Sequence, residues 1–211
     1  YKLVLKIDFQ KLLLASKLML YSFDTNTIEQ LKKLIISKEN LFISNVEQTG
    51  IATGDVILIR ETEIGMIIVG GPGQTIYVRN SAIIIDLGGD DIYYNNAGAS
   101  TQNFPLSILV DISGNDKYIS SQPFTQGCGV LGTGILIDIS GDDLYSSGDI
   151  SQGVGILGSG FLIDLDGDDQ YSGKSSVQGL GLFGIGFILE RKGGDRYLAD
   201  RYAQGVGFTK G

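Results

Sequence analysis

Acidic residues recur through the second half of the chain, each time in a short turn that contains glycine. The five turns read GGDDIY, SGNDKY, SGDDLY, DGDDQY and GGDRY. Carboxylate and amide oxygens are the ligands that calcium prefers, but the same side chains also close turns by hydrogen bonding to nearby backbone groups. We take turn closure as the first interpretation and calcium binding as the alternative. The candidate calcium ligands are Asp90, Asp91, Asn115, Asp116, Asp142, Asp143, Asp168, Asp169 and Asp195.

Stacking these turns on one another would bring like charges together. In a column with a spacing of ~4.8 Å, neighbouring carboxylates repel by about 1 kcal/mol in water and about 3.5 kcal/mol at an effective dielectric constant near 20. Bound cations, turn N–H groups or exposure to solvent must offset that repulsion. A second acidic position, at the end of each apolar strand, is a further candidate that neighbouring Arg or Lys could neutralise. Its members are Asp86, Asp111, Asp138, Asp164 and Glu190.

The elements that must position these acids are copies of one pattern. A fixed period of 20–50 residues is typical of solenoids and related arrays. Glycine and β-branched residues are too frequent for helical repeats, so about 26 residues suit one coil of a parallel β-solenoid. The sequence therefore predicts a mainly β chain, a parallel β-solenoid of about five 26-residue coils. The tyrosines that end the turns set the period, with spacings of 25, 27, 26 and 26 residues: Tyr93, Tyr118, Tyr145, Tyr171 and Tyr197.

The residues before the repeats predict a short opening coil and a small N-terminal α-helical cap. Residues 67–77 align without gaps to residues 83–93 and form the opening coil. Residues 9–21 predict a helix with Asp8 as its N-cap, and a capping box opens a second helix at about 27–37. These helices would hide the open edge of the first coil. The expected divisions are a strand and helical cap at 1–50, opening strands and coil at 51–82, and the repeat solenoid at 83–211.

Stacked coils predict rows of like side chains along the long axis. The tyrosines predict an aromatic column, with sugar stacking on their rings as an alternative function. Each copy also contains a GxGxxG pattern, but its recurrence among strands excludes a dinucleotide site, which needs one strand before it and a helix after it. An amide ladder that closes a turn is predicted at a strict interval of 26 residues: Gln126, Gln152, Gln178 and Gln204.

The acidic turns, SGDDLY at 140–145 for example, resemble those of the calcium-binding RTX β-roll proteins. These are secreted repeat proteins whose turn aspartates bind calcium between coils. The resemblance covers about six residues per copy, and it departs in period, because that family repeats every nine residues whereas this chain repeats about every 26. It implies calcium as the one cofactor, bound at the turns named above.

Composition excludes several classes of function. The chain has no histidine and one cysteine, Cys128, so it lacks the commonest general base and the usual zinc ligands. Its net charge is −8, divided as +2 over residues 1–50 and −10 over 51–211, which opposes binding to nucleic acid. No apolar run reaches the ~18 residues of a membrane span. Because the chain opens on Tyr1 and not on methionine, we expect a mature, processed or partial chain. We also expect it to be located outside the cell or on its surface.

Two features predict self-association, and the alternative for the open last coil is a chain that continues past residue 211. The segment LKIDF at 5–9 matches the strand that would begin a further coil, so one subunit could complete the open coil of the next. A row of apolar side chains would form an outward stripe that needs a partner surface. The residues of the first surface are Tyr1, Leu3, Leu5, Ile7 and Phe9, and those of the second are Ile84, Leu109, Leu136, Leu162 and Ile188.

We therefore expect a structural or interaction protein that binds copies of itself, with a head-to-tail filament as the expected form of assembly, and is not an enzyme. No nucleophile and base can be paired in the sequence. The alternative is a polysaccharide-active enzyme, a lyase or hydrolase, or a glycan-binding module on a parallel β-helix. Such sites interrupt the repeat with long loops on one face, and the copies here differ in length by only a residue or two.

Overall fold

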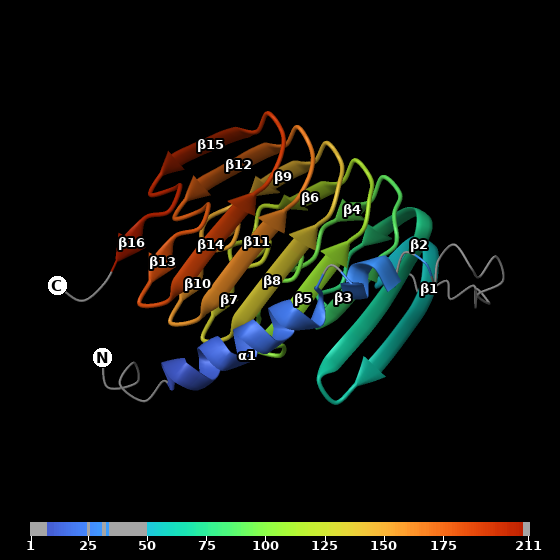
Figure 1. The fold of residues 1–211 in the computed structure, drawn as a ribbon, viewed down its shortest axis with the longest axis horizontal. Helices are drawn as coiled ribbons and strands as arrows, with labels where there is room; N and C mark the ends of the chain where they lie inside the picture. Colours follow the sequence, from blue (N-terminus) through green and yellow to red (C-terminus); the bar gives the residue numbers. More distant parts are fainter. Residues whose placement is uncertain (1–7, 25, 31–32, 34–49, 209–211) are drawn as a thin grey trace.

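The chain winds into a parallel β-solenoid preceded by a short helix, which confirms the predicted fold class (Figure 1). Residues 26–30 and 33 are also helical, and the remainder of the predicted second helix lies outside the described residues. The structure is a computed structural model and describes residues 8–24, 26–30, 33 and 50–208. Each full coil contributes strands to two long sheets, and the later coils add a short strand to a third.

The sheets are parallel ladders with one strand per coil. The first sheet contains β3 (Ile83–Asp86), β5 (Leu106–Asp111), β8 (Thr133–Asp138), β11 (Ser159–Asp164) and β14 (Ile185–Glu190). The second contains β4 (Ile92–Tyr93), β6 (Lys117–Ser120), β9 (Leu144–Ser147), β12 (Gln170–Ser175) and β15 (Arg196–Arg201). The third contains β7 (Gly129–Val130), β10 (Gly155–Ile156), β13 (Gly181–Leu182) and β16 (Gly207–Phe208).

The opening coil is formed by one long strand, β2 (Gly65–Tyr77), which joins the first two sheets. Its first half pairs with β3, with Ile67 opposite Ile83, and its second half pairs with β4, with Tyr77 opposite Tyr93. This is the gapless alignment that the sequence predicted. The other edge of β2 pairs in antiparallel fashion with β1 (Ala52–Thr62). The open edge of the first coil is therefore covered by a strand, whereas α1 lies against later coils.

The helix α1 (Phe9–Ser22) lies across the outside of the first sheet, against β8 and β11 (Figure 1). Asp8 is its N-cap, as predicted, and accepts a hydrogen bond from the N–H of Lys11 at 3.1 Å. On the buried side, the hydroxyl of Ser16 lies 2.9 Å from that of Thr133. Among the described residues, no helix has the length and apolar character that crossing a bilayer requires. The predicted strand at 1–7 lies outside the described residues, and Phe9 begins the helix.

The interior contains two facing rows of side chains. Successive repeat tyrosines from Tyr77 to Tyr197 stack with ring centroids 4.5–4.7 Å apart and planes within 8° of parallel. The predicted aromatic column is therefore confirmed. Its rings are buried from Tyr77 to Tyr171, so no sugar can stack on them. Packed in the same core is the aliphatic row of the first sheet: Ile68, Ile84, Leu109, Leu136 and Leu162 are buried, and Ile188 is partly buried.

This position of the aliphatic row overturns the predicted outward stripe. Ile84, Leu109, Leu136, Leu162 and Ile188 point inward, because the alternate residues of the same strands form the outer face. That outer face includes Ile108, Val110, Ile135 and Ile137, and it is covered by side chains of the N-terminal region such as Met19 and Ile28. Both faces of the first sheet are thus apolar, as is usual for parallel sheets, and the outer face is packed over β5, β8 and β11 but exposed over β14.

The repeated glutamines close turns by binding the backbone, and not one another. The amide of Gln126 donates to the carbonyls of Tyr118 at 2.9 Å and Ser146 at 3.0 Å, so it joins its own coil to the next. Gln152 repeats the arrangement with Tyr145 and Ser172. Each glutamine has a positive φ of 55–60°, a conformation that costs about 1–2 kcal/mol for a residue with a Cβ. These hydrogen bonds therefore stabilise an unfavourable backbone geometry.

Candidate metal centre

The predicted calcium ligands divide into an outer and an inner set. The outer set, Asp90, Asn115, Asp142 and Asp168, is exposed. The inner set, Asp91, Asp116, Asp143 and Asp169, is at most 2% exposed. The two sets alternate because adjacent residues of an extended chain point to opposite sides. Asp195 belongs to the inner position but lies in the last coil and is half-buried.

Both sets tie neighbouring coils together through their first carboxylate oxygen. Asp143 Oδ1 accepts a hydrogen bond from the N–H of Asp116 in the preceding coil at 2.7 Å. Asp142 Oδ1 accepts one from the N–H of Asp168 in the following coil at 2.9 Å. The same pairings recur in the other coils. The turn acids thus bind the backbone, as the first interpretation required, although between coils and not within one turn.

The glycine of each turn is required by this close stacking. Gly141 has φ +156°, and a Cβ placed on it would lie 1.5 Å from the carbonyl oxygen of Gly114 in the coil before. Gly167 would meet Gly141 in the same way at 1.8 Å. No side chain fits at that distance, so the turns can approach closely enough for the inter-coil hydrogen bonds only because the residue is glycine.

The strand-end acids also point inward and join the inner set in one continuous buried cluster, which we call the acid column. Carboxyl oxygens of three residues lie within 4.8 Å of one another in each of four groups, and consecutive groups share a member. Eight of the nine residues are at most 2% exposed, and the ninth, Glu190, is partly buried. The column comprises Asp86, Asp91, Asp111, Asp116, Asp138, Asp143, Asp164, Asp169 and Glu190.

Three of the five strand-end acids, Asp86, Asp111 and Asp138, accept hydrogen bonds on both oxygens, whereas Asp164 Oδ1 and Glu190 Oε2 have no partner among the described residues. Tyr118 OH donates to Asp138 Oδ2 at 2.6 Å, and Tyr145 OH donates to Asp164 Oδ2 at 2.7 Å, so each tyrosine binds an acid of the next coil. Tyr77 and Tyr171 donate to Asp86 and Glu190. The other oxygen of Asp138 accepts from a backbone N–H two residues further on, as do those of Asp86 and Asp111.

The inner turn acids, in contrast, each have one unpartnered oxygen. The Oδ2 atoms of Asp91, Asp116, Asp143 and Asp169 are buried and have no hydrogen-bond partner among the described residues. Basic side chains do not supply one, since the ion pairs of the described residues join Lys11 to Asp8 and Lys192 to Asp166. The predicted neutralisation of the strand-end acids by Arg or Lys is therefore wrong.

Burial in this column disfavours the charged form of every acid in it. Loss of hydration, the largest cause, raises the pKa of Asp91 to about 6 and the pKa of Asp116 and Asp169 to about 7. Burial followed by repulsion from Asp91 raises the pKa of Asp86 to about 9. The pKa of Asp138 is also raised well above its usual value. At neutral pH the column must therefore hold protons or cations.

The donor set fits a hard divalent cation. Two oxygens on opposite sides of one calcium ion lie about 4.6–5.2 Å apart, because Ca–O distances are about 2.3–2.6 Å. The carboxyl oxygens in each group of three lie within 4.8 Å of one another, so one ion can contact all three. All the donors are oxygens, whereas zinc favours nitrogen and sulfur. Cys128 lies in a separate apolar cluster with Val154 and Leu180. Four divalent ions would carry +8 against −9 for the nine ionised carboxylates, so the charges nearly balance.

Comparison with family models, with curated proteins and with solved structures found no match to the chain.

Proposed function

We propose that the chain is a structural β-solenoid, a rod-like scaffold whose coils are held together by hard divalent cations, calcium above all, in the acid column. The observation that carries this proposal is the set of four buried, unpartnered Oδ2 atoms, each on an aspartate grouped with two further carboxylates. Each cation would be held by one inner turn acid and by strand-end acids of the same and the next coil, for example Asp116, Asp111 and Asp138.

The energetics favour an ion over an empty ionised column. Neighbouring carboxylates ~4.8 Å apart repel by about 3.5 kcal/mol at an effective dielectric constant near 20, and the column contains several such pairs. A domain is stable by only ~5–15 kcal/mol. Protons shared between paired carboxyl groups would also offset the repulsion, and the experiment below separates the two.

The site supports a scaffold over the polysaccharide lyase or hydrolase that the sequence left as the alternative. The acids of the column are closed from solvent, so a polymer cannot reach them. A scaffold that needs calcium suits the exterior of a cell, where protein modules that bind calcium with dissociation constants of about 0.1–1 mM are occupied by the ion. Assembly into filaments stays a prediction, because residues 1–7 lie outside the described residues and the second predicted surface is in the core.

The test compares the purified protein in EDTA and in calcium. We expect the thermal midpoint to fall in EDTA and to recover with calcium. Inductively coupled plasma mass spectrometry should find up to four calcium ions bound per chain. Terbium, a calcium substitute, should show luminescence sensitised by the tyrosines that donate to the column. Magnesium should restore less stability, because it requires a smaller, more regular site.

Two variants locate the effect. Asp143→Asn keeps Oδ1 as the acceptor for the N–H of Asp116 and replaces the unpartnered Oδ2 by an uncharged amide NH2. It should therefore raise the midpoint in EDTA and weaken the calcium response. Asp142→Asn is the matched control, since it changes an exposed acid to the residue that already stands at the equivalent position, Asn115. Identical thermal midpoints in EDTA and calcium, with no bound metal, would overturn the proposal that cations occupy the acid column and would favour protons shared between carboxyl groups.

A further inference from the structure

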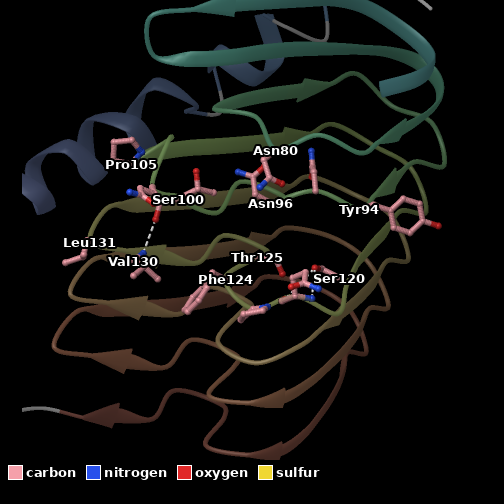
Figure 2. A pocket seen from close by; sticks show the side chains of 15 residues that line it. Asn80, Tyr94, Asn96, Ser100, Pro105, Ser120, Phe124, Thr125, Val130 and Leu131 are labelled. Carbon is pink, nitrogen blue, oxygen red and sulfur yellow. Dashed lines mark hydrogen bonds between the residues drawn. The ribbon is translucent and has the colours of Figure 1, made fainter. Parts of the chain in front are cut away.

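A groove lies on the face of the solenoid where the third sheet ends. That sheet stops at β7, because the coil before it has the irregular loop 99–105 in place of a strand. Ser100 of this loop holds the edge of β7, since its N–H donates to Cys128 O at 2.8 Å and its Oγ accepts from the N–H of Val130 at 2.9 Å. The groove, of about 720 Å³, lies between this loop and residues 120–125 of the next coil (Figure 2).

The lining of the groove excludes recognition by charge. None of its fifteen side chains is charged, although 19% of the residues in the chain are. An anionic or cationic ligand would therefore find no ion-pair partner. A volume of this size is within the ~300–1,000 Å³ that small-molecule sites occupy.

Two aromatic rings from neighbouring coils are open to solvent at the groove. Tyr94 is 51% exposed and Phe124 is 40% exposed, and Figure 2 shows both among the lining residues, on different parts of the wall. Exposed rings of this size are available for stacking against another apolar face. Leu131 and Pro105 add further apolar surface.

Uncharged polar groups complete the lining. Asn80, Gln102 and Gln122 are exposed, and their amides have no hydrogen-bond partner among residues 50–208. Each amide offers both a donor and an acceptor. The amide of Asn96, in contrast, is already hydrogen-bonded within the protein, since it donates to Ala99 O at 2.7 Å and to Ser107 Oγ at 3.0 Å. The exposed amides are therefore the ones free to bind a ligand.

We propose that this groove binds a short neutral oligosaccharide. A sugar ring has an apolar C–H face that can stack on Tyr94 or Phe124, and its edge carries hydroxyl groups that both donate to and accept from an amide. Glycosidic cleavage by the usual route needs a pair of carboxyl groups, and no carboxylate lines the groove. The groove therefore binds the saccharide and does not cut it. This proposal is independent of the acid column.

The test is calorimetric titration, in calcium buffer, with a panel of neutral oligosaccharides: cello-, malto-, xylo-, manno- and chito-oligosaccharides of several units. Oligogalacturonate serves as the charged probe and a proline-rich peptide as the peptide probe, since such peptides also occupy aromatic grooves. We expect at least one neutral saccharide to bind and the charged probe not to bind. Saturation-transfer NMR should show contact between the aromatic protons and the saccharide.

Matched variants make the result specific to the groove. Tyr94→Ala and Phe124→Ala should each weaken binding about tenfold or more, as expected for aromatic anchors. Tyr202→Ala and Phe183→Ala remove rings of similar exposure, 54% and 40%, outside the groove and should leave affinity unchanged. The proposal is overturned if no neutral saccharide binds at millimolar concentration, if only the peptide binds, or if both pairs of variants behave alike.

Discussion

The repeat tyrosines from Tyr77 to Tyr171 each have two roles that can be separated by removing one atom. The ring of Tyr118 stacks between those of Tyr93 and Tyr145 at 4.7 Å, and its hydroxyl donates to Asp138. The fold places the hydroxyl of one coil on the acid of the next. The tyrosine column therefore supplies donors to an otherwise acidic interior as well as apolar surface.

The first prediction concerns this hydroxyl. Tyr118→Phe keeps the ring but leaves one oxygen of a buried carboxyl group without its donor, so the free energy of unfolding should fall by about 1–3 kcal/mol. Urea denaturation in calcium buffer measures it. Tyr202→Phe, at an exposed position in the last coil, is the control and should change stability by less than about 0.5 kcal/mol. Equal effects of the two variants would contradict the assigned role.

The second prediction concerns pH in the absence of metal. The pKa of Asp91, raised to about 6, and those of Asp116 and Asp169, raised to about 7, lie above the usual value of 3.8. Between these limits the unfolded chain has released protons that the folded chain retains, so stability decreases as pH rises. In EDTA the free energy of unfolding should therefore fall between pH 4 and pH 7. Unfolding by urea across that range measures it, and a rise would contradict the burial of these acids.

At the scale of the elements, the coils are joined by side chains that reach the backbone of the next coil. Gln152 donates to carbonyls of its own coil and of the next, whereas Gln204, its equivalent in the last coil, is exposed. Gln152→Ala should thus lower the free energy of unfolding by about 1–3 kcal/mol and Gln204→Ala by less than about 0.5 kcal/mol. Differential scanning calorimetry of both variants checks the prediction, and a larger loss for Gln204→Ala would refute it.

The inward direction of the aliphatic row can be tested on β8. Leu136 is fully buried, whereas Leu198 is 52% exposed. Leu136→Ala creates a cavity in the core and should cost about 2–5 kcal/mol, while Leu198→Ala should have a small effect. Chemical denaturation of the two variants measures the difference. Had the row faced outward, the two substitutions would be similarly mild.

At the scale of the whole molecule, the stack behaves as a one-dimensional array in which each coil contacts its neighbours. Residues 135 and 161 hold the same register position in β8 and β11. Deleting residues 135–160 should therefore leave a folded rod that is shorter by one coil, with one calcium ion fewer per chain. Circular dichroism and metal analysis report fold and stoichiometry. A deletion variant that is unfolded in calcium would contradict the modular stack.

The sequence by itself determined the period, the rows and the fold class. Once residues about 26 apart occupy equivalent positions, parallel pairing must place Tyr118, Tyr145 and Tyr171 in line. No contact with the N-terminal region is needed to form this row. The close packing of the turns was readable in the same way from their invariant spacing to glycine. Which acid of each turn is exposed and which is buried was not predicted from the sequence. The available signal was that adjacent residues of an extended chain, such as Asp142 and Asp143, point to opposite sides.

Only the tertiary structure decided which face of each strand is the interior. In β8 both Ile135 and Leu136 are apolar, so alternation cannot choose between them. The choice depends on α1, which is distant in sequence and supplies an apolar cover for Ile135 and Ile137, and this allows Asp138 to turn inward beside Leu136. The groove likewise depends on loops from two coils that meet only when the stack forms. Contacts between distant segments carry no local signature, and for this reason the acid column and the groove appear only in the folded chain.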